Sequence, residues 1–279
     1  MKICIASGKG GTGKTTIAVN LALSIGGNVQ FADCDVEEPN AHIFLKPEIE
    51  KTETVGLPIP EIDIDKCSFC GKCQEICQFN ALLVIKDNVL VFPELCHSCA
   101  GCWLVCPEQC IYQKKKDIGE VEEGKANGID FVHGRLKIGG VLVPPLIRAV
   151  KKRVDSHKTV IIDAPPGTSC PVIEAIKGSD FIILATEPTP FGLHDLKLAV
   201  EMVRILNIPF GVVVNRADIG DNEVDKYCES EKIPLLMKLN HDRKIAEAYS
   251  EGTPFTLVFT EYREKFKQLY QKIQRRVEL

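Results

Sequence analysis

Short apolar runs alternate with amphipathic segments along most of the chain. The first run, Lys2–Ala6, has the length of a buried strand, and in the segment that follows it Ile17 and Leu21 share one helical face. Runs of strand length recur at Val29–Ala32, Thr159–Ile162, Phe181–Thr186, Phe210–Asn215 and Ile233–Leu239. Strands that alternate with helices in this way predict an α/β domain with a mainly parallel sheet flanked by helices.

Three later segments have the pattern of helices that would cover this sheet. Leu193–Leu206 places apolar side chains on one face, and Pro144–Val154 begins with proline, which suits the first turn of a helix. Glu261–Leu279 carries an apolar stripe, and acidic residues interrupt its cationic positions. We therefore expect this last helix to pack on the sheet rather than to bind a membrane. Phe131–Lys137 alternates apolar and polar residues, which predicts an edge strand.

A cysteine-rich segment interrupts the α/β pattern. Prolines break any regular element at its start, and cysteines then dominate as far as Cys110. The pattern resumes after three consecutive lysines. We therefore expect an inserted domain at residues 58–116 within a domain formed by residues 1–57 and 117–279.

Composition changes this picture only in part. A chain of 279 residues is long enough for one α/β domain and a small insert, and 45% hydrophobic residues with a net charge of −4 are typical of a globular protein. There is no basic excess of the kind that nucleic-acid binding needs. No apolar stretch approaches the roughly 18 residues of a membrane span, and the first residues lack a signal-peptide pattern, so we expect a cytoplasmic protein. In that compartment 13 cysteines indicate metal binding rather than disulfides.

A glycine-rich loop follows the first predicted strand. Residues Ser7–Thr16 satisfy the pattern G-x-x-x-x-G-K-[ST], in which backbone N–H groups and the start of a helix face a phosphate. Lys14 can reach the β- and γ-phosphates, and the Thr15 hydroxyl can hold Mg²⁺. We expect a nucleoside triphosphate to be bound by Gly8, Lys9, Gly10, Gly11, Thr12, Gly13, Lys14, Thr15 and Thr16.

Two further predicted strands lead into carboxylates. Val29–Ala32 is followed by Asp33 and Asp35, and Thr159–Ile162 is followed by Asp163. Ligands of open α/β sheets lie at the carboxyl ends of the strands, which favours Asp163 as the Walker B carboxylate facing the Mg²⁺. For Asp33 and Asp35 a solvated turn is the alternative.

A second lysine inside the loop indicates which class of phosphate-loop protein this chain resembles. With Lys9 the loop reads K-G-G-x-G-K-T-T, which resembles the deviant Walker A ATPases: MinD and ParA, the Mrp-type carriers and the nitrogenase iron protein. In that family the early lysine reaches the nucleotide of the other subunit, so the resemblance implies a nucleotide-sandwich homodimer. It also implies that Asp35 positions or activates the attacking water, with Asp33 nearer the Mg²⁺. Gly167, in D-x-P-P-G, would sense the γ-phosphate through its backbone. Asn215 would read the adenine edge, and a turn-forming asparagine is the alternative.

The catalytic residues that this resemblance implies are Lys9, Lys14, Asp35 and Asp163.

The insert contains one cysteine pattern twice. C-x2-C-x2-C-x3-C runs from Cys67 to Cys77 and again from Cys96 to Cys106, where Pro107 follows. This is the run of bacterial two-cluster ferredoxins, in which the fourth cysteine of each run ligates the other cluster. The predicted ligands are Cys67, Cys70, Cys73 and Cys106 for one [4Fe-4S] cluster, and Cys96, Cys99, Cys102 and Cys77 for the second. Zinc is an alternative that the spacing disfavours.

Four cysteines outside the motif have weaker interpretations. We expect Cys110 to be a small buried hydrophobe. Cys170 lies seven residues after Asp163, the offset of a cluster cysteine in the nitrogenase iron protein, but we favour a buried structural thiol. A shared cluster there would need a second cysteine, for which Cys34 and Cys228 are candidates by count only.

The resemblance covers essentially the whole chain and implies a function. It implies an ATPase, converting ATP and water to ADP and phosphate, in which the nucleotide state of a homodimer controls electron transfer through the two clusters to a partner protein. The alternative is an ATPase that assembles or carries iron–sulfur clusters or another metallocofactor. The expected cofactors are two [4Fe-4S] clusters, ATP and Mg²⁺, and neither nucleic acid nor a membrane is an expected partner.

Overall fold

The computed structural model describes residues 1–277 of the chain, which form two compact units. The first unit contains Met1–Glu53, Val121–Arg135 and Pro144–Leu279, and the second contains Thr54–Glu120 and Leu136–Val143. Strands β3 (Glu48–Ile62) and β6 (Ile111–Ala126) have residues in both units.

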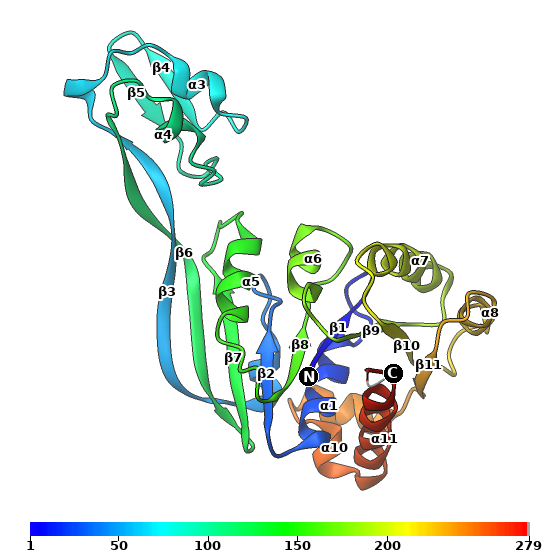
Figure 1. Ribbon diagram of the computed structural model, residues 1–279. Coiled ribbons are helices and arrows are strands. Elements are labelled where there is room, and N and C mark those ends of the chain that lie inside the picture. Colours follow the sequence, from blue (N-terminus) through cyan, green and yellow to red (C-terminus); the bar gives the residue numbers. More distant parts are fainter. Residues whose placement is uncertain (278–279) are drawn as a thin grey trace. The chain divides into compact units, whose positions relative to one another are not determined.

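Within residues 1–277, nine strands form one large sheet in the order β11-β10-β9-β1-β8-β2-β7-β6-β3 (Figure 1). The strands of its parallel part are β1 (Lys2–Ala6), β2 (Val29–Asp33), β7 (Ile129–Leu136), β8 (Thr159–Asp163), β9 (Phe181–Thr186), β10 (Phe210–Asn215) and β11 (Leu235–Leu239). Each adjacent pair among these seven strands runs parallel, which confirms the predicted α/β class with a mainly parallel sheet.

The prediction of an edge strand at Phe131–Lys137 is wrong. Phe131–Leu136 of that segment lies in β7, which pairs with β2 on one side and with β6 on the other. The sheet continues beyond β7 because β6 and β3 extend it as an antiparallel pair, in which Lys51 lies beside Glu123 and Asp63 N–H donates to Cys110 O at 2.8 Å. The part of β3 from residue 48 to residue 54 is exposed and rich in charge, so it lacks the apolar pattern of a core strand.

Helices cover the parallel part of the sheet. They are α1 (Lys14–Ile25), α2 (Ala41–Leu45), α5 (Val143–Lys151), α6 (Cys170–Ile176), α7 (Pro190–Ile205), α8 (Glu223–Ser230), α9 (Arg243–Ser250), α10 (Phe255–Val258) and α11 (Thr260–Val277). In α11, Phe266, Leu269 and Ile273 are buried in the same core as the inner face of α1, which confirms that this helix packs rather than projects. The last two residues of the predicted helix lie outside the described residues. No helix within residues 1–277 combines the length and apolar character of a membrane span.

The second unit repeats one backbone conformation. It holds the antiparallel pair β4 (Leu82–Ile85) and β5 (Asn88–Val91), the short turn η1 (Ile64–Lys66) and two five-residue helices, α3 (Lys72–Ile76) and α4 (Gly101–Val105). Each helix begins five residues after the first cysteine of its motif. Left-handed backbone occurs at matching positions of the two motifs: Phe69 and Ser98 (φ 53° and 55°), Gly71 and Ala100 (77° and 67°), and Asn80 and Gln109 (both 52°). The sequence duplication is therefore also a structural duplication.

Candidate functional site

The glycine-rich loop joins β1 to α1, and its backbone requires glycine at two places. Gly13 has φ 88°, and a Cβ there would lie 2.5 Å from Asn215 Nδ2. A Cβ on Gly8 would lie 2.1 Å from the Asp195 carbonyl oxygen. Gly11 also has a left-handed conformation, with φ 78°. These glycines let the loop curl in front of the first turn of α1 with its backbone exposed to a ligand.

The start of α1 is linked to the end of β8. The Thr15 hydroxyl donates a hydrogen bond to Asp163 Oδ2 at 2.6 Å, and Lys14, in the same turn, is only 6% exposed. The other carboxylate oxygen, Asp163 Oδ1, is buried and has no hydrogen-bond partner among residues 1–277. Burial raises the pKa of Asp163 to about 7, although Lys14 and the Thr15 hydrogen bond both lower it. A buried carboxylate with a free oxygen beside a hydroxyl is a set of hard oxygen donors that fits Mg²⁺.

The two carboxylates that follow β2 have different surroundings. Asp33 is fully buried and accepts hydrogen bonds from the backbone N–H groups of Asp35 (3.0 Å) and Ala41 (3.1 Å), while burial raises its pKa well above the usual range. Asp35 lines the cavity in front of the loop, and burial raises its pKa to about 6, although Lys14 lowers it. Asp33 therefore closes the turn between β2 and α2, whereas Asp35 faces the ligand space. The alternative of a solvated turn is wrong for Asp33.

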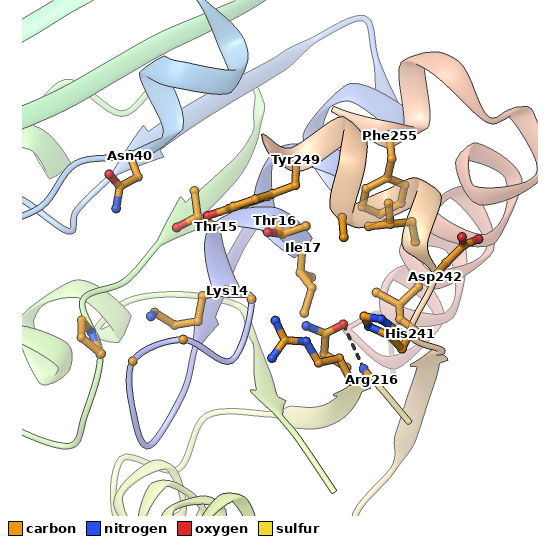
Figure 2. A pocket seen from close by; sticks show the side chains of 18 of the residues that line it. Lys14, Thr15, Thr16, Ile17, Asn40, Arg216, His241, Asp242, Tyr249 and Phe255 are labelled. Atoms are coloured by element: carbon orange, nitrogen blue, oxygen red, sulfur yellow. Dashed lines mark hydrogen bonds between the residues drawn. The ribbon is translucent and has the colours of Figure 1, made fainter. Parts of the chain in front are cut away.

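A cavity of about 510 Å³ opens in front of the loop (Figure 2). On the loop side its walls include Gly10, Gly11, Gly13, Lys14, Thr15, Thr16 and Ile17. On the side of β10 and β11 they include Asn215, Arg216, Leu239, Asn240, His241, Asp242, Ile245, Tyr249 and Phe255. In Figure 2, Lys14 lies at one end of the space, Arg216 and His241 lie together at the other, and Tyr249 extends over the start of α1. The cavity thus has Lys14 at the loop, the carboxylates of Asp35 and Glu38 in its wall, and mixed polar and aromatic side chains at its far end.

The far end contains residues that the sequence did not indicate: Arg216, His241, Tyr249 and Phe255. The strand-end rule that singled out Asn215 applies equally to β11, because Leu239 is the neighbour of Asn215 in the sheet register. That rule could have indicated His241, two residues beyond the end of β11. Tyr249 and Phe255 come from α9 and α10, whose short sequences carry no comparable signal.

Asn215 braces the loop from β10. Its Nδ2 donates to the Thr12 carbonyl oxygen at 3.1 Å, and its Oδ1 accepts from the backbone N–H of Arg216 at 3.0 Å. One Nδ2 hydrogen and one lone pair of Oδ1 remain available toward the cavity. The side chain therefore supports the loop in addition to any contact with a ligand.

Two other predicted residues lie at the margin of the cavity. The Gly167 backbone N–H donates to the Ser7 carbonyl oxygen at 3.0 Å, and its φ of 96° is accessible mainly to glycine. This bond ties the segment after β8 to the start of the glycine-rich loop. The Lys9 carbonyl oxygen accepts from the Ser7 hydroxyl at 2.6 Å. The half-buried side chain of Lys9 is not among the cavity walls, and it has no ion-pair partner in the part of the chain that the structure describes.

The expectation of a buried Cys170 is wrong. Cys170 is exposed, because α6 begins there at the surface, directly after the loop that contains Gly167. Cys34 and Cys228, its candidate companions, are 0% and 2% exposed. They are enclosed by the core and do not reach the surface at which Cys170 lies.

In the second unit the motif cysteines line two small cavities. The first cavity is lined by Cys67, Cys70, Cys73 and Cys106, together with Cys110, and the second by Cys77, Cys96, Cys99 and Cys102. The other walls are largely apolar and include Val84, Val89 and Ile111 in the first and Ala81, Leu82 and Trp103 in the second. Backbone N–H groups point at two of the sulfurs, from Phe69 to Cys67 Sγ (3.4 Å) and from Ala81 to Cys77 Sγ (3.3 Å).

The thiols stand around each cavity rather than converging on one point. Among the described residues, no three or more His, Cys, Asp or Glu side chains gather as closely as a single metal ion requires. Zinc holds four ligands at about 2.0–2.3 Å, whereas the thiolates of a four-iron cluster each bind a different iron and therefore lie farther apart. Four thiols around an apolar space, with backbone N–H groups directed at sulfur, fit a polynuclear cluster.

The loop, the buried carboxylate and the cavity define the class: a phosphate-loop protein with an open nucleotide pocket at the carboxyl ends of a parallel sheet. The family model of the CobQ/CobB/MinD/ParA nucleotide-binding domain matches residues 3–255, and the chain belongs to this family. It is an ATP-binding protein of the MinD/ParA ATPase type. The class implied by the loop sequence is thereby confirmed.

Comparison with individual proteins adds detail. An uncharacterized protein of Methanocaldococcus jannaschii is 32% identical over 260 residues, which cover 91% of each chain. An iron–sulfur cluster carrier protein of the same organism is 25% identical over 296 residues, covering 99% of this chain and 85% of that protein. The septum site-determining protein MinD from Pyrococcus horikoshii, complexed with Mg-ADP, has a TM-score of 0.58 and 19% identity, and covers 98% of this chain and 95% of its own. At that identity the likeness concerns the fold alone.

Proposed function

We propose that this protein is a nucleotide-controlled iron–sulfur protein, in which ATP binding and hydrolysis by a homodimer control electron transfer through two [4Fe-4S] clusters to a partner protein. One observation carries the proposal. A phosphate-loop pocket and two cavities, each lined by four cysteines of a duplicated motif, occur in the same chain. We assign residues 1–57 and 117–279 to the ATPase domain and residues 58–116 to an inserted ferredoxin domain.

In the ATPase, each part of the pocket has a separate task. The loop N–H groups and Lys14 bind the β- and γ-phosphates, and Thr15 with Asp163 holds the magnesium ion. When bound, Mg²⁺ neutralises charge on the phosphate oxygens. Asp35, which lines the cavity, orients a water molecule toward the γ-phosphate and accepts its proton. The products are ADP and inorganic phosphate.

The far end of the cavity binds the nucleoside. Tyr249 offers a ring surface for stacking, and Asn215 still has one donor and one acceptor available for a base edge. Arg216 already pairs with Glu187 at 2.8 Å, so its charge is partly neutralised before any ligand binds.

We assign to Lys9 a role in dimerisation, as a contact to the nucleotide of the second subunit. Its side chain is absent from the walls of its own cavity and has no ion-pair partner within residues 1–277, as expected of a cation that serves the nucleotide of a second copy. The loop resemblance supplies the geometry: two subunits face each other across two nucleotides. Gly167, bonded to Ser7, and Asp35 then belong to the segments that respond to the γ-phosphate.

The inserted domain is assigned two clusters. Cys67, Cys70, Cys73 and Cys106 would hold one, and Cys96, Cys99, Cys102 and Cys77 the other. When bound, each cluster can accept and donate one electron. The exchange of Cys77 and Cys106 between the motifs ties the two halves of the insert together, which a segment of this size needs because its own core is small.

A specific observation also favours a second function. The M. jannaschii relative that matches 99% of this chain is named an iron–sulfur cluster carrier protein. Cys70, Cys99 and Cys170 are exposed, and surface thiols suit the release and capture of a cluster. In this alternative the ATPase drives delivery of a cluster to an acceptor protein rather than delivery of electrons.

The test is anaerobic purification followed by iron counting and redox spectroscopy with ATP, with ADP and without nucleotide. The proposal predicts about eight irons per chain, as two four-iron clusters require, and cluster potentials or oxidation rates that depend on the nucleotide. Lys14→Ala should keep the iron and lose the nucleotide dependence. Far fewer irons, or the same nucleotide response in Lys14→Ala, would contradict the proposal. Loss of iron from the loaded protein to an apo-ferredoxin, accelerated by ATP, would favour the carrier function instead.

A further inference from the structure

The first cysteine-lined cavity contains five thiols, one more than a four-iron cluster needs. The fifth is Cys110, which is 1% exposed and whose Sγ lies 3.5 Å from Cys106 Sγ. Its carbonyl oxygen accepts from the Asp63 N–H at 2.8 Å, which holds the backbone of Cys110 in place. A thiol at this distance and with this burial can donate S–H to a neighbouring sulfur.

The structural duplication identifies the counterpart of Cys110. Cys110 lies four residues after the last cysteine of its motif, and Ala81 lies four residues after Cys77. The preceding residues, Gln109 and Asn80, have the same left-handed φ of 52°, and Ala81 is also 1% exposed. The two positions are therefore equivalent, but only one carries a donor side chain.

We propose that Cys110 is a positioning residue that gives the two clusters different reduction potentials. Its S–H donates a hydrogen bond to the Cys106 sulfur and raises the reduction potential of the cluster that Cys106 binds. The proposal rests on the proposed function, since it requires the clusters. Reduction adds one electron and places more negative charge on the sulfurs, so a donor to a ligand sulfur stabilises the reduced form. At Ala81 the methyl group offers no such bond. The electron then resides preferentially on the cluster beside Cys110.

The experiment uses the full-length protein, purified anaerobically, with redox titration followed by electron paramagnetic resonance. Cys110→Ala reproduces the environment of Ala81, and Cys110→Ser restores a donor. We expect Cys110→Ala to lower one of the two cluster potentials by up to about 59 mV, which is a tenfold change in a one-electron equilibrium, and to leave the other unchanged. Cys110→Ser should remain close to wild type. The reciprocal variant, Ala81→Cys, should raise the potential that Cys110→Ala leaves unchanged.

Two results would overturn the inference. One is a pair of potentials that do not change in either Cys110→Ala or Ala81→Cys. The other is a loss of about half of the iron in Cys110→Ala together with its retention in Cys106→Ala, which would make Cys110 the ligand in place of Cys106. If Cys110→Ala fails to fold, the Ala81→Cys titration decides alone. Failure of the proposed function is recognised separately, because it leaves wild-type protein with far fewer than eight irons.

Discussion

One hydroxyl group joins the phosphate loop to the buried end of β8. The Thr15 hydroxyl donates to Asp163 Oδ2, and Asp163 Oδ1 has no partner within residues 1–277, so the pair is prepared for a cation. Removing the hydroxyl leaves a buried carboxylate without the one side-chain donor that it has within residues 1–277, and a bound Mg²⁺ would lose one oxygen ligand. We therefore expect the Thr15 and Asp163 side chains to contribute to nucleotide binding together, and only when Mg²⁺ is present.

We expect Thr15→Ala to abolish the Mg²⁺-dependent part of ATP affinity and to lower kcat/KM by about a hundredfold or more, as the loss of one preorganised polar group does. Calorimetric titration of ATP with Mg²⁺ and with EDTA measures the first effect, and phosphate release measures the second. Thr15→Ser keeps the hydroxyl and is the matched control. An equal response to Mg²⁺ in Thr15→Ala and wild type would show that Thr15 does not hold the metal.

His133 gives the stability of the chain a dependence on pH. It is 2% exposed, its Nε2 lies 2.6 Å from Glu122 Oε2, and the His42 and Phe131 rings pack against it. Burial lowers the pKa of His133, although Glu122 raises it; His42 and Arg135 lower it further. A histidine whose pKa is lower in the folded protein than the unfolded value of about 6.5 contributes stability above that value and loses it as the pH falls below.

Urea unfolding at pH 7, 6 and 5 should therefore show that the free energy of unfolding of His133→Gln rises relative to that of wild type as the pH falls toward 5. The two proteins are compared with each other because the raised pKa values of Asp35 and Asp163 give both of them a pH dependence of the opposite sign. The exposed His157 supplies the control, because His157→Gln should retain the wild-type pH dependence. If the pH dependence of His133→Gln equals that of wild type, another group is responsible for it.

At the scale of elements, α5 holds the end of α6. Lys151 Nζ donates to three carbonyl oxygens at the end of α6, those of Glu174 (2.6 Å), Ala175 (2.9 Å) and Lys177 (2.6 Å). Arg148, one turn earlier in α5, pairs with the Glu174 side chain at 2.8 Å. The last carbonyl groups of a helix have no partner within the helix, so a cation there satisfies them and interacts favourably with the helix dipole. Because α6 follows the Gly167 loop, this contact anchors the far end of a segment that touches the nucleotide site.

Lys151→Met retains the aliphatic stem and removes the three hydrogen bonds. We expect the free energy of unfolding to fall by about 1–3 kcal/mol, as when buried acceptors lose their donor, and amide exchange in α6 to become faster. Lys152→Met is the control, because Lys152 is the exposed neighbour, and surface changes of this kind stay within about 0.5 kcal/mol. Equal stability of the two variants would contradict a role for Lys151 in holding α6.

The elements that the sequence predicted best are those whose burial is nearly complete. β1, β2, β8, β9 and β10 are continuous apolar runs because a parallel sheet covered on both faces admits little else, and their ends located Asp35, Asp163 and Asn215. β3 escaped prediction because its first half is exposed and charged. The expectation that Pro58 and Pro60 break any regular element is also wrong, because both lie within β3, which is an edge strand of the sheet and therefore tolerates proline. Such a strand is held by pairing with β6 and by contacts such as that of Glu53 with Arg153 (2.7 Å), which are distant in sequence. The prediction that Cys170 is buried was wrong because the spacing of residues in the sequence does not show whether a side chain is exposed.

At the scale of the whole molecule, the chain combines two units that were predictable to different degrees. In the second unit, the spacing of the cysteines predicted the repeat, but it could not indicate that Ala100 takes the left-handed conformation that glycine takes at position 71. In the first unit, the loop pattern predicted the phosphate end of the pocket, whereas the far end depends on α9 and α10, which reach it only through the tertiary fold. A motif of consecutive residues therefore predicts the chemistry of its own segment. The part of a pocket that is formed by segments distant in the sequence becomes visible only in the structure.

The last prediction concerns the assembly of two copies. If Lys9 serves the nucleotide of a second subunit, Lys9→Ala should bind ATP with unchanged affinity, because its side chain is not among the walls of its own cavity. It should nevertheless fail to dimerise with ATP and should hydrolyse it about a thousandfold more slowly or worse, which is the scale of a cation supplied in trans to phosphoryl transfer. Lys14→Ala should differ by losing ATP affinity itself, and Lys152→Ala should behave as wild type. Light scattering with ATP, with ADP and without nucleotide, alongside fluorescent-nucleotide binding, separates these cases. An ATP-dependent dimer of Lys9→Ala with normal turnover would place the role of this lysine within its own subunit.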